Sequence, residues 1–377
     1  MPKAGRLQRL LAGTVVNIHS MPRADRRGST GSSNERHPTA TRSNRAVLQD
    51  VTQPVNQLDA QGDPARVLVT GANGQIGRRL IERLARSNPR VPVRAVVRSE
   101  RAAETLAALP VEIQSEIFVV DYRDAGALAE IARDCRYAVH LVGILKETST
   151  SSYRDAHETS VRAIADAAAA ADLRRVVYLS ILGSNPKSTN ACLASKGRAE
   201  QILLGAKTPA LVLRVPMVVG PGDVTANIVR REALARVLPL AAGGRSRTQP
   251  IYAGDVVEAV VAGLERDGLD DLILDLAGPE SLTQREFIER AAELHGRRPR
   301  VVSIPTALLG FIARLAERFL SNPPLTKSAL EVILADDEVD PEPARRKLGI
   351  ELTPLDEILR RCVGPQADSD NLEREGK

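Results

Sequence analysis

The sequence has few of the residues on which several classes of protein depend. Of its 377 residues three are cysteine, none is tryptophan, and the aromatic residues together make up 2%. Cys135, Cys192 and Cys362 form no CxxC pair and leave an odd number, which is typical of a reducing compartment, so we expect no disulfide framework. So few aromatic rings also provide few platforms for stacking nucleic-acid bases.

Metal ligands and long apolar runs are scarce as well. The histidines and cysteines match neither an HExxH nor a zinc-ribbon spacing, so we expect no metal site. No uninterrupted apolar run reaches the length of about eighteen residues that suggests a membrane-spanning helix. The composition therefore indicates a protein that is soluble or peripheral to a membrane.

The charge of the chain is unevenly distributed. The formal net charge is +5, but residues 1–48 hold nine Lys/Arg against two Asp/Glu, which leaves the rest at −2. Without a basic surface, we expect no nucleic-acid partner. Residues 1–63 are rich in Arg, Ser, Thr, Asn and Gln, and we predict a disordered basic leader there. We favour an over-extended gene start over the alternative, a matrix-targeting helix near Arg6–Leu11.

From Arg66 onward, short runs rich in Val, Ile and Leu alternate with helical stretches. Continuous apolar strands separated by helices predict an α/β fold with a Rossmann-like, doubly wound parallel sheet covered on both faces. The runs are VLVT (67–70), VPVRAVV (91–97), EIFVVD (116–121), YAVHLVG (137–143), RVVYLS (175–180) and ALVLRV (210–215), with LILDLAG (272–278) as a late seventh.

This alternation also predicts the domain organisation. We expect a Rossmann domain over residues 64–215, whose core sheet is extended by later strands. Prolines, GPGD and longer helices follow Pro216, so a smaller C-terminal, substrate-side α/β subdomain is expected over residues 216–364. The last residues, 365–377, are polar and predicted to form a frayed tail.

A glycine-rich turn follows the first apolar run directly. VLVT leads into Gly71-Ala72-Asn73-Gly74-Gln75-Ile76-Gly77, and an amphipathic helical stretch comes next. The first glycine permits a tight turn, the second lets the backbone approach a pyrophosphate, and the third lets the helix pack on the strand. The free N–H groups and positive dipole end of that helix suit phosphates. The turn therefore predicts dinucleotide binding, rather than a glycine-rich turn without a ligand.

The second apolar run favours one of the two nicotinamide dinucleotides. It ends at Arg98, where NAD-specific sites usually carry an acidic residue that bonds the ribose 2′-hydroxyl. A guanidinium there matches a 2′-phosphate, and Arg78 stands where it can assist. We therefore expect NADP(H) in preference to NAD(H). The alternative interpretation of Arg98 is a solvated cation at a strand end.

Further cofactor contacts are expected where later strands end. Asp121, followed by Tyr122, is placed to accept a hydrogen bond from the adenine amino group, and Val142 and Gly143 would lie along the adenine-side ribose. The cofactor-binding residues predicted from the strand ends and the turn are Gly71, Asn73, Gly74, Gln75, Ile76, Gly77, Arg78, Arg98, Asp121, Tyr122, Val142 and Gly143.

TGANGQIG (70–77), Asp121, LVG (141–143) and LS (179–180) together resemble the short-chain dehydrogenase/reductase superfamily, in its extended and atypical branches. The resemblance covers about residues 66–360. In that superfamily a serine and a Tyr-x-x-x-Lys helix carry hydride transfer, and the lysine lowers the tyrosine pKa and holds the nicotinamide ribose. The resemblance implies Ser180 and Lys196 as catalytic candidates, with Lys196 also as a cofactor contact.

Cys192 occupies the place of the catalytic tyrosine, four residues before Lys196, and no Tyr-x-x-x-Lys occurs anywhere in the chain. A nearby lysine favours a thiolate, because positive charge lowers a cysteine pKa from about 8.5. The cysteine side chain is nevertheless too short to place its sulfur where the phenol oxygen of a tyrosine would lie. Proton transfer needs heavy atoms about 3 Å apart. We favour Cys192 as a small apolar helix residue, which leaves open whether the chain is an enzyme.

The second half of the chain contains four distinctive blocks, which are LRVPMVVGPGD (213–223), PIYAGDVVEAVVAGLE (250–265), LDLAGPESLTQREFIERAAELHGRRPRVVSIP (274–305) and NPPLTKSALEVILADDEVDPEPARRKLGI (322–350). Together they resemble the NAD(P)H-binding accessory-subunit family of respiratory complex I and its bacterial relatives. The resemblance implies a tightly held NADPH in a structural or assembly role, often without an intact catalytic tyrosine.

The leading hypothesis is therefore an NADPH-binding, non-catalytic or weakly catalytic accessory factor with a respiratory-chain or quinone-pathway protein partner. One alternative is an NADPH-dependent reductase or a nucleotide-sugar epimerase or dehydratase, and another is a redox sensor of the NADPH/NADP+ ratio. We expect a bacterial cytoplasmic location, with peripheral contact at the inner membrane, and the mitochondrial matrix as the alternative.

The stretch Pro305–Leu320 is amphipathic. Its pattern most simply predicts a helix that buries an ordinary core face, and docking on a partner or lying at a membrane interface are the alternatives. The apolar positions are Leu308, Leu309, Ile312, Leu315, Phe319 and Leu320, against Arg314, Glu317 and Arg318.

Overall fold

The centre of the structure, a computed structural model, is a seven-stranded sheet. The structure describes residues 65–365 except 114, 321–322 and 324–325, so the predicted leader lies outside the described residues. The strands are β1 (Arg66–Thr70), β2 (Val93–Val97), β3 (Glu116–Val119), β4 (Cys135–His140), β5 (Arg175–Ile181), β6 (Ala210–Val215) and β11 (Leu272–Asp275). Each contains residues of one of the seven predicted apolar runs, so this part of the fold prediction is confirmed.

All neighbouring strands of this sheet are parallel, in the spatial order β11-β6-β5-β4-β1-β2-β3. Strand order reverses between β1 and β4, which is the topological switch point of a doubly wound sheet. Ligands of such sheets bind outside the carboxyl ends of the strands at this point. The Rossmann-like fold class predicted from the sequence is confirmed, and the topology directs attention to the residues after β1 and β4.

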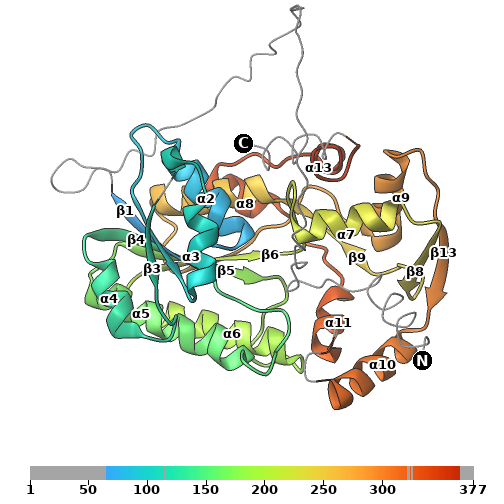
Figure 1. The fold of residues 1–377 in the computed structure, drawn as a ribbon, viewed down its shortest axis with the longest axis horizontal. Coiled ribbons are helices and arrows are strands. Elements are labelled where there is room, and N and C mark those ends of the chain that lie inside the picture. The colour runs from blue at the N-terminus through green and yellow to red at the C-terminus, as the bar shows by residue number, and fades with distance from the viewer. Residues whose placement is uncertain (1–64, 114, 321–322, 324–325, 366–377) are drawn as a thin grey trace, which may run out of the picture.

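Helices cover both faces of the sheet, as Figure 1 shows for α2 and α8 on one side and α4, α5 and α6 on the other. Val67 and Val69 of β1 pack in one buried cluster and Leu68 in the other, because successive strand residues point to opposite faces. The first layer comprises α2 (Gln75–Ala85), α3 (Glu100–Ala107), α8 (Ala253–Glu265) and α12 (Glu342–Leu348), and the second α4 (Ala125–Ala132), α5 (Ser160–Ala170) and α6 (Ala191–Leu204).

The remaining elements lie beyond the carboxyl side of the sheet, around a separate core made by α7, α9, α13 and β8. The helices are α7 (Val224–Ala233), α9 (Gln284–Glu293), α10 (Thr306–Phe319), α11 (Lys327–Ile333) and α13 (Leu355–Cys362). The strands pair as β7 (Val218–Val219) with β10 (Ile251–Tyr252), β8 (Val237–Ala241) with β13 (Arg300–Ile304), and β9 (Arg247–Thr248) with β12 (Leu282–Thr283). Two short turns, η1 (Val111–Ile113) and the π-helical η2 (Arg154–Thr159), complete the elements.

The amphipathic stretch at 305–320 forms α10, but the expected core face is only partly realised. Leu309 and Ala313 are buried against α11 and β8. Leu308, Leu315 and Phe319, predicted to share that face, are 49%, 47% and 71% exposed. Within the described ranges, no helix is both long enough and apolar enough to cross a membrane.

Candidate functional site

The glycine turn joins β1 to α2 at the switch point of the sheet. Gly71 has φ +72°, a left-handed conformation that favours glycine, and a Cβ there would lie 3.1 Å from the carbonyl carbon of Leu141 after β4. A Cβ on Gly77 would lie 2.5 Å from the Ala72 carbonyl oxygen, so α2 packs directly on the turn. Because the first and third glycines are required sterically, the turn has the close-packed form predicted for a dinucleotide site.

The first turn of α2 is suited to an anion. Gly74 is its N-cap and supplies no side-chain hydrogen bond, and the first turn contains no acidic residue. Arg78 donates from Nη2 to Gln75 Oε1 at 3.0 Å, while its Nε is buried with no hydrogen-bond partner in the described part of the chain. Burial, with the neighbouring charge of Arg79, lowers the pKa of Arg78. A buried donor without a partner is costly, and an incoming phosphate oxygen would satisfy it.

The adenosine end of the predicted site lies where β2 and β3 end. Arg98 is exposed after β2, and its positive charge acts on Asp121 and Tyr122 after β3. Burial raises the pKa of Tyr122 to about 12, and its phenol lies near the backbone of Gly71. The structure therefore brings Arg98, Asp121 and Tyr122 together at the edge of the glycine turn.

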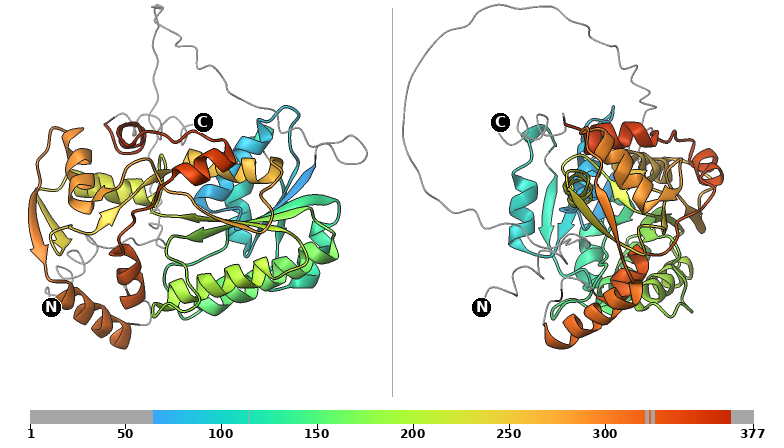
Figure 2. Two further views of the ribbon diagram at one scale, coloured as in Figure 1. Left: turned by 180° about the vertical axis from the view of Figure 1, so that it is seen from behind. Right: turned by 90° about the vertical axis from the view of Figure 1, so that its right-hand side faces the viewer.

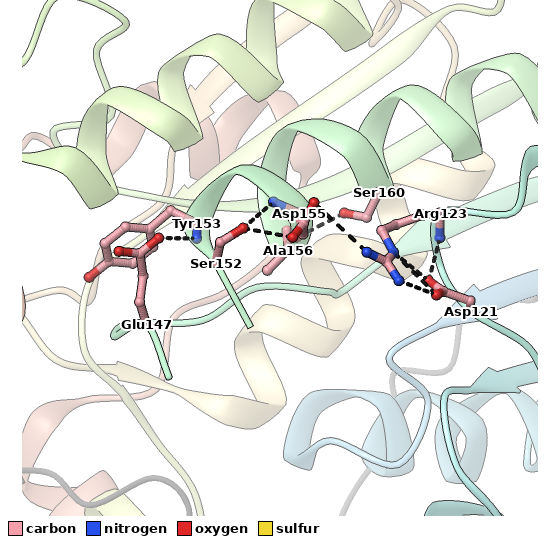
Figure 3. Close-up of polar contacts among 8 residues, drawn as sticks. All are labelled: Asp121, Arg123, Glu147, Ser152, Tyr153, Asp155, Ala156 and Ser160. Carbon is pink, nitrogen blue, oxygen red and sulfur yellow. Dashed lines mark hydrogen bonds and ion pairs between the residues drawn. The ribbon is translucent and has the colours of Figure 1, made fainter. Parts of the chain in front are cut away.

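Asp121 has a partner that the sequence analysis missed. Arg123 donates from Nε to Oδ1 at 2.9 Å and from Nη2 to Oδ2 at 2.6 Å, and it also lies 3.9 Å from Asp155 of η2 (Figure 3). This hydrogen bonding by Arg123 lowers the pKa of Asp121. The spacing Asp-x-Arg directly after the third apolar run was the available signal. Asp121 can therefore accept a hydrogen bond from the adenine amino group only through a carboxylate lone pair that Arg123 does not use.

Lys196 lies at the opposite end, beside the residues that follow β4. A Cβ on Gly143 would be 2.9 Å from Lys196 Nζ, so the two residues are in contact. The ammonium donates to the Tyr178 hydroxyl at 3.0 Å and to the Leu179 carbonyl at 3.1 Å, and it also lies 4.6 Å from the centre of the Tyr178 ring. Burial lowers the pKa of Lys196 to about 8. The phenol that contacts this lysine therefore belongs to a tyrosine of β5, and not to a residue of α6.

Ser180, at the end of β5, already has a hydrogen-bond partner within the protein. Its hydroxyl donates to Glu200 Oε1 at 2.6 Å, and Glu200 in turn accepts from Arg214 Nε at 3.0 Å and Nη2 at 2.5 Å. The Ser180 residue is 1% exposed and the Glu200 side chain 3% exposed. Sequence analysis missed Glu200 and Arg214, although Glu200 stands one helical turn after Lys196. The serine proton is directed into a buried ion pair.

Cys192 is a packed thiol. The residue is 1% exposed, and its Sγ lies 3.7 Å from the Ile144 carbonyl oxygen as a weak hydrogen bond. Burial raises its pKa to about 11, despite the nearby positive charge of Lys196. The thiol is therefore protonated near neutral pH, and the thiolate that Lys196 could favour is a minor form. This geometry supports the apolar interpretation of Cys192.

Two more side chains that the sequence did not indicate line this end of the site. His157 lies in the π-helical turn η2, a feature frequent at functional sites, and Tyr153 stacks on it with ring centres 5.6 Å apart. His157 Nε2 lies 3.1 Å from both the nitrogen and the oxygen of Ile144, and burial lowers its pKa to about 2. The imidazole is therefore neutral, and it shares the loop after β4 with Gly143.

The C-terminal elements close over this end. Asn190 Nδ2 donates to the Ser328 carbonyl at 2.9 Å and to Glu331 at 3.0 Å, which links the start of α6 to α11. Lys146 donates to the Pro323 carbonyl at 2.7 Å. The lysine-bearing helix is thus tied to α11, and the loop after β4 is tied to the segment that precedes α11. In the described ranges, no group of three or more His, Cys, Asp or Glu side chains is placed to hold a metal ion.

Comparisons with known proteins agree with this geometry. A family model described as NAD(P)H-binding matches residues 71–233. The chain is 28% identical over 269 residues to the mitochondrial NADH dehydrogenase (ubiquinone) 1 alpha subcomplex subunit 9 of Arabidopsis thaliana, covering 67% of this chain and 65% of that protein. It is 27% identical over 286 residues to the mitochondrial NADH-ubiquinone oxidoreductase 40 kDa subunit of Neurospora crassa, covering 75% and 74%. It is 28% identical over 242 residues to the ceramide reductase of Caulobacter vibrioides, covering 63% and 73%.

Solved structures share the fold. MoeE5 in complex with UDP-glucuronic acid and NAD superposes with a TM-score of 0.62 at 19% identity, covering 82% of this chain and all of that one. An NADPH-dependent quinone oxidoreductase from Escherichia coli gives 0.59 at 19% identity, covering 78% and 98%. The fold and the matched segment define a Rossmann-type NAD(P)H-binding protein. More narrowly, the chain resembles the atypical short-chain dehydrogenase/reductase family and is similar to the complex I accessory subunits.

Proposed function

We propose that this chain is an NADPH-binding accessory or assembly factor of respiratory complex I or of quinone metabolism, with little or no catalytic turnover. The observation that carries the proposal is a contrast between the two ends of the site. Arg78 and the first turn of α2 present unsatisfied donors, whereas Ser180, Cys192 and Lys196 are 1%, 1% and 5% exposed and already have partners.

The residues at the turn fit a phosphorylated dinucleotide. The α2 N-terminus and Arg78 would hold the pyrophosphate, and Arg98 would pair with a 2′-phosphate because it is exposed where β2 ends. Lys196, in contact with Gly143, would donate to the nicotinamide ribose. A bound NADPH would supply a hydride at that end of the site.

The groups expected to move a proton there are poorly suited to do so. Ser180 donates to Glu200, and the thiol of Cys192 has a pKa raised to about 11 by burial. An accessory role is supported by two relatives whose names place them in mitochondrial NADH dehydrogenase. We infer a respiratory-chain protein as the partner, with the chain at the cytoplasmic side of a bacterial inner membrane.

The test begins with nucleotide bound to the purified full chain. We expect NADPH to co-purify or to bind, and its oxidation by quinones, aldehydes or nucleotide sugars to stay near the uncatalysed rate. Turnover that Lys196→Ala abolishes, and that Lys207→Ala on the surface leaves intact, would overturn the non-catalytic proposal. A chain that binds no nucleotide at millimolar concentration would overturn the binding proposal as well. Membrane pull-downs should recover respiratory-chain subunits.

A reductase is the second candidate, because Lys196 and a phenol do meet in space. Tyr178 lies 3.0 Å from Lys196 Nζ, although it comes from β5. Relatives include a ceramide reductase, and structural neighbours include an NADPH-dependent quinone oxidoreductase. Tyr178 is 0% exposed, so it would act by positioning the lysine. If the chain is a reductase, Tyr178→Phe should shift the pH profile of turnover, because the phenol oxygen that accepts from Lys196 is lost.

A further inference from the structure

Helix α10 exposes more large apolar side chains than any other described helix. Leu309 and Ala313 bury one side of it, but the side chains on its other side face outward. The exposed fractions are 49% for Leu308, 63% for Phe311, 47% for Leu315 and 71% for Phe319, and Leu320 at the C-cap is 50% exposed. Exposed apolar surface of this extent on one helix marks an interaction site.

These side chains form one continuous face. Positions 308, 311, 315 and 319 are separated by three, four and four residues, which places them along a single stripe of the helix. We call this set of residues the α10 stripe. Leu309 and Ala313 lie on the adjoining side and pack with Ala329 and Leu330 of α11. Figures 1 and 2 show α10 at the periphery of the molecule, away from the seven-stranded sheet. The exposed fractions of its four residues show that the stripe faces solvent.

The charges beside the α10 stripe are positive. Arg314 and Arg318 are exposed, and each stands three residues after a member of the stripe, so they border its solvent edge. The single acidic residue of the helix, Glu317, accepts a hydrogen bond from the Lys327 backbone at 2.9 Å and is thereby held toward α11. The exposed rim of the stripe therefore attracts anions.

The size of the stripe distinguishes between occupants. Its four half-exposed Leu and Phe side chains, at ~200 Å² for a whole side chain, present on the order of 500 Å². A stable contact between two protein copies buries about 800 Å² on each, which the stripe does not reach. A bilayer surface, in contrast, takes up a single amphipathic helix through its apolar face, and a cationic edge adds attraction to anionic lipids.

We propose that the α10 stripe binds the surface of an anionic lipid bilayer. α10 packs on α11, and α11 is joined to the helix that bears Lys196 through Asn190. Docking through the stripe therefore places the nicotinamide end of the site, not the glycine turn, nearest the membrane. The proposed lipid binding does not depend on the proposed NADPH binding, because no residue of the glycine turn belongs to the α10 stripe.

The experiment measures binding of the purified full chain to sedimented vesicles, either of phosphatidylcholine alone or with one third phosphatidylglycerol. We expect binding to the anionic vesicles, and we expect Phe311→Ser with Phe319→Ser to weaken it by on the order of tenfold or more, since two apolar side chains no longer enter the bilayer. Arg314→Glu with Arg318→Glu should remove most of the preference for anionic lipid. The matched control is Val111→Ser, an apolar residue 74% exposed on η1, which should bind as the parent does.

The basic segment 1–48 provides a competing explanation, because nine Lys/Arg can also attract anionic vesicles. Vesicle binding that survives the two serine substitutions would therefore overturn the proposal. So would a chain that ignores vesicles but forms a dimer that the same substitutions dissociate. Far-ultraviolet circular dichroism and NADPH binding of the serine variant check that it folds. Loss of vesicle binding with NADPH binding intact separates this surface from the nucleotide proposal.

Discussion

At the scale of single residues, we expect Arg98 to distinguish NADPH from NADH. It is exposed at the end of β2, where a 2′-phosphate would lie and where NADH has only a hydroxyl. Arg98→Ala should weaken NADPH binding by about 10- to 100-fold, because a charge-assisted hydrogen bond contributes about 1.5–3 kcal/mol. NADH affinity should not change. Isothermal titration with both nucleotides measures the two affinities. The control variant is Arg162→Ala on α5, which removes one positive charge at another position. Equal losses for both nucleotides would contradict the assignment.

If Lys196 contacts the bound nucleotide as proposed, it should give nucleotide affinity a characteristic pH dependence. Burial lowers the pKa of Lys196 to about 8, so the free protein loses the ammonium as pH rises through that value. Binding above pH 8 then requires uptake of a proton, and NADPH affinity should fall by up to about tenfold per pH unit. Below about pH 7 the lysine is charged, and the remaining dependence belongs to the 2′-phosphate, whose pKa is near 6. Titrations from pH 7 to 9.5 measure the slope. Lys196→Met should bind more weakly with a flat profile over that range, and a slope that persists in this variant would refute the assignment.

Two of the residues that the sequence missed act on a predicted site residue from another element. Glu200 of α6 accepts from Ser180 of β5, and Tyr178 of β5 accepts from Lys196 of α6, whereas Arg123 lies only two residues from its partner Asp121. No fixed spacing in the chain links Tyr178 to Lys196, since the contact depends on how α6 lies across β5. Ser180 and Lys196, in contrast, stand at fixed places relative to a strand end and a helix, so the sequence alone was enough to propose them as site residues.

At the scale of elements, Arg175 joins the start of β5 to the end of α8. Its side chain is 2% exposed, and it donates to Asp270 at 2.6 Å, to the Gly263 carbonyl at 2.6 Å and to the Arg266 carbonyl at 2.9 Å. A cation at these carbonyls also suits the negative end of the α8 dipole. Arg175→Met should lower the free energy of unfolding by about 3 kcal/mol, because buried acceptors lose their donor.

The adjacent Arg174 is a matched control for that prediction. It binds the same Asp270 at 3.0 Å, but its side chain is 34% exposed. Solvent screens such a pair, so Arg174→Met should cost less than about 1 kcal/mol. Denaturation in urea, followed by circular dichroism, measures both variants. Similar losses for the two arginines would show that burial is not what distinguishes them.

Helix α10 shows where an element-level prediction was incomplete. The amphipathic pattern predicted a helix, which is confirmed, and a core face, which holds for Leu309 and fails for Leu308, Leu315 and Phe319. Hydrophobic periodicity shows that one face of a helix is apolar, but it does not show what covers that face. In α10 the rest of the protein covers only part of the apolar face and leaves the other apolar side chains exposed.

At the scale of the whole molecule, a bound dinucleotide should stabilise the fold. Binding only to the folded state adds about 2.7 kcal/mol when NADPH is present at 100 times its dissociation constant. The turn between β1 and α2 follows the strand next to β4, the central strand of the seven-stranded sheet, so we expect Tm of the main transition to rise. A thermal melt with NADPH, NADH and ATP measures this. A rise of equal size with ATP would point to a polyanion effect without a specific dinucleotide site.

Much of this architecture was determined by the sequence alone. Val-rich runs alternating with helices specified a parallel doubly wound sheet, and three glycines after the first run specified the tight turn between β1 and α2, because both are local patterns tied to backbone geometry. Only the tertiary structure decided that Ser180 donates to Glu200, that Tyr178 meets Lys196, and that the α10 stripe faces outward. Those outcomes depend on which strands become neighbours and on which helix side the body of the protein covers. Side-chain contacts between distant segments exist only once the chain has packed.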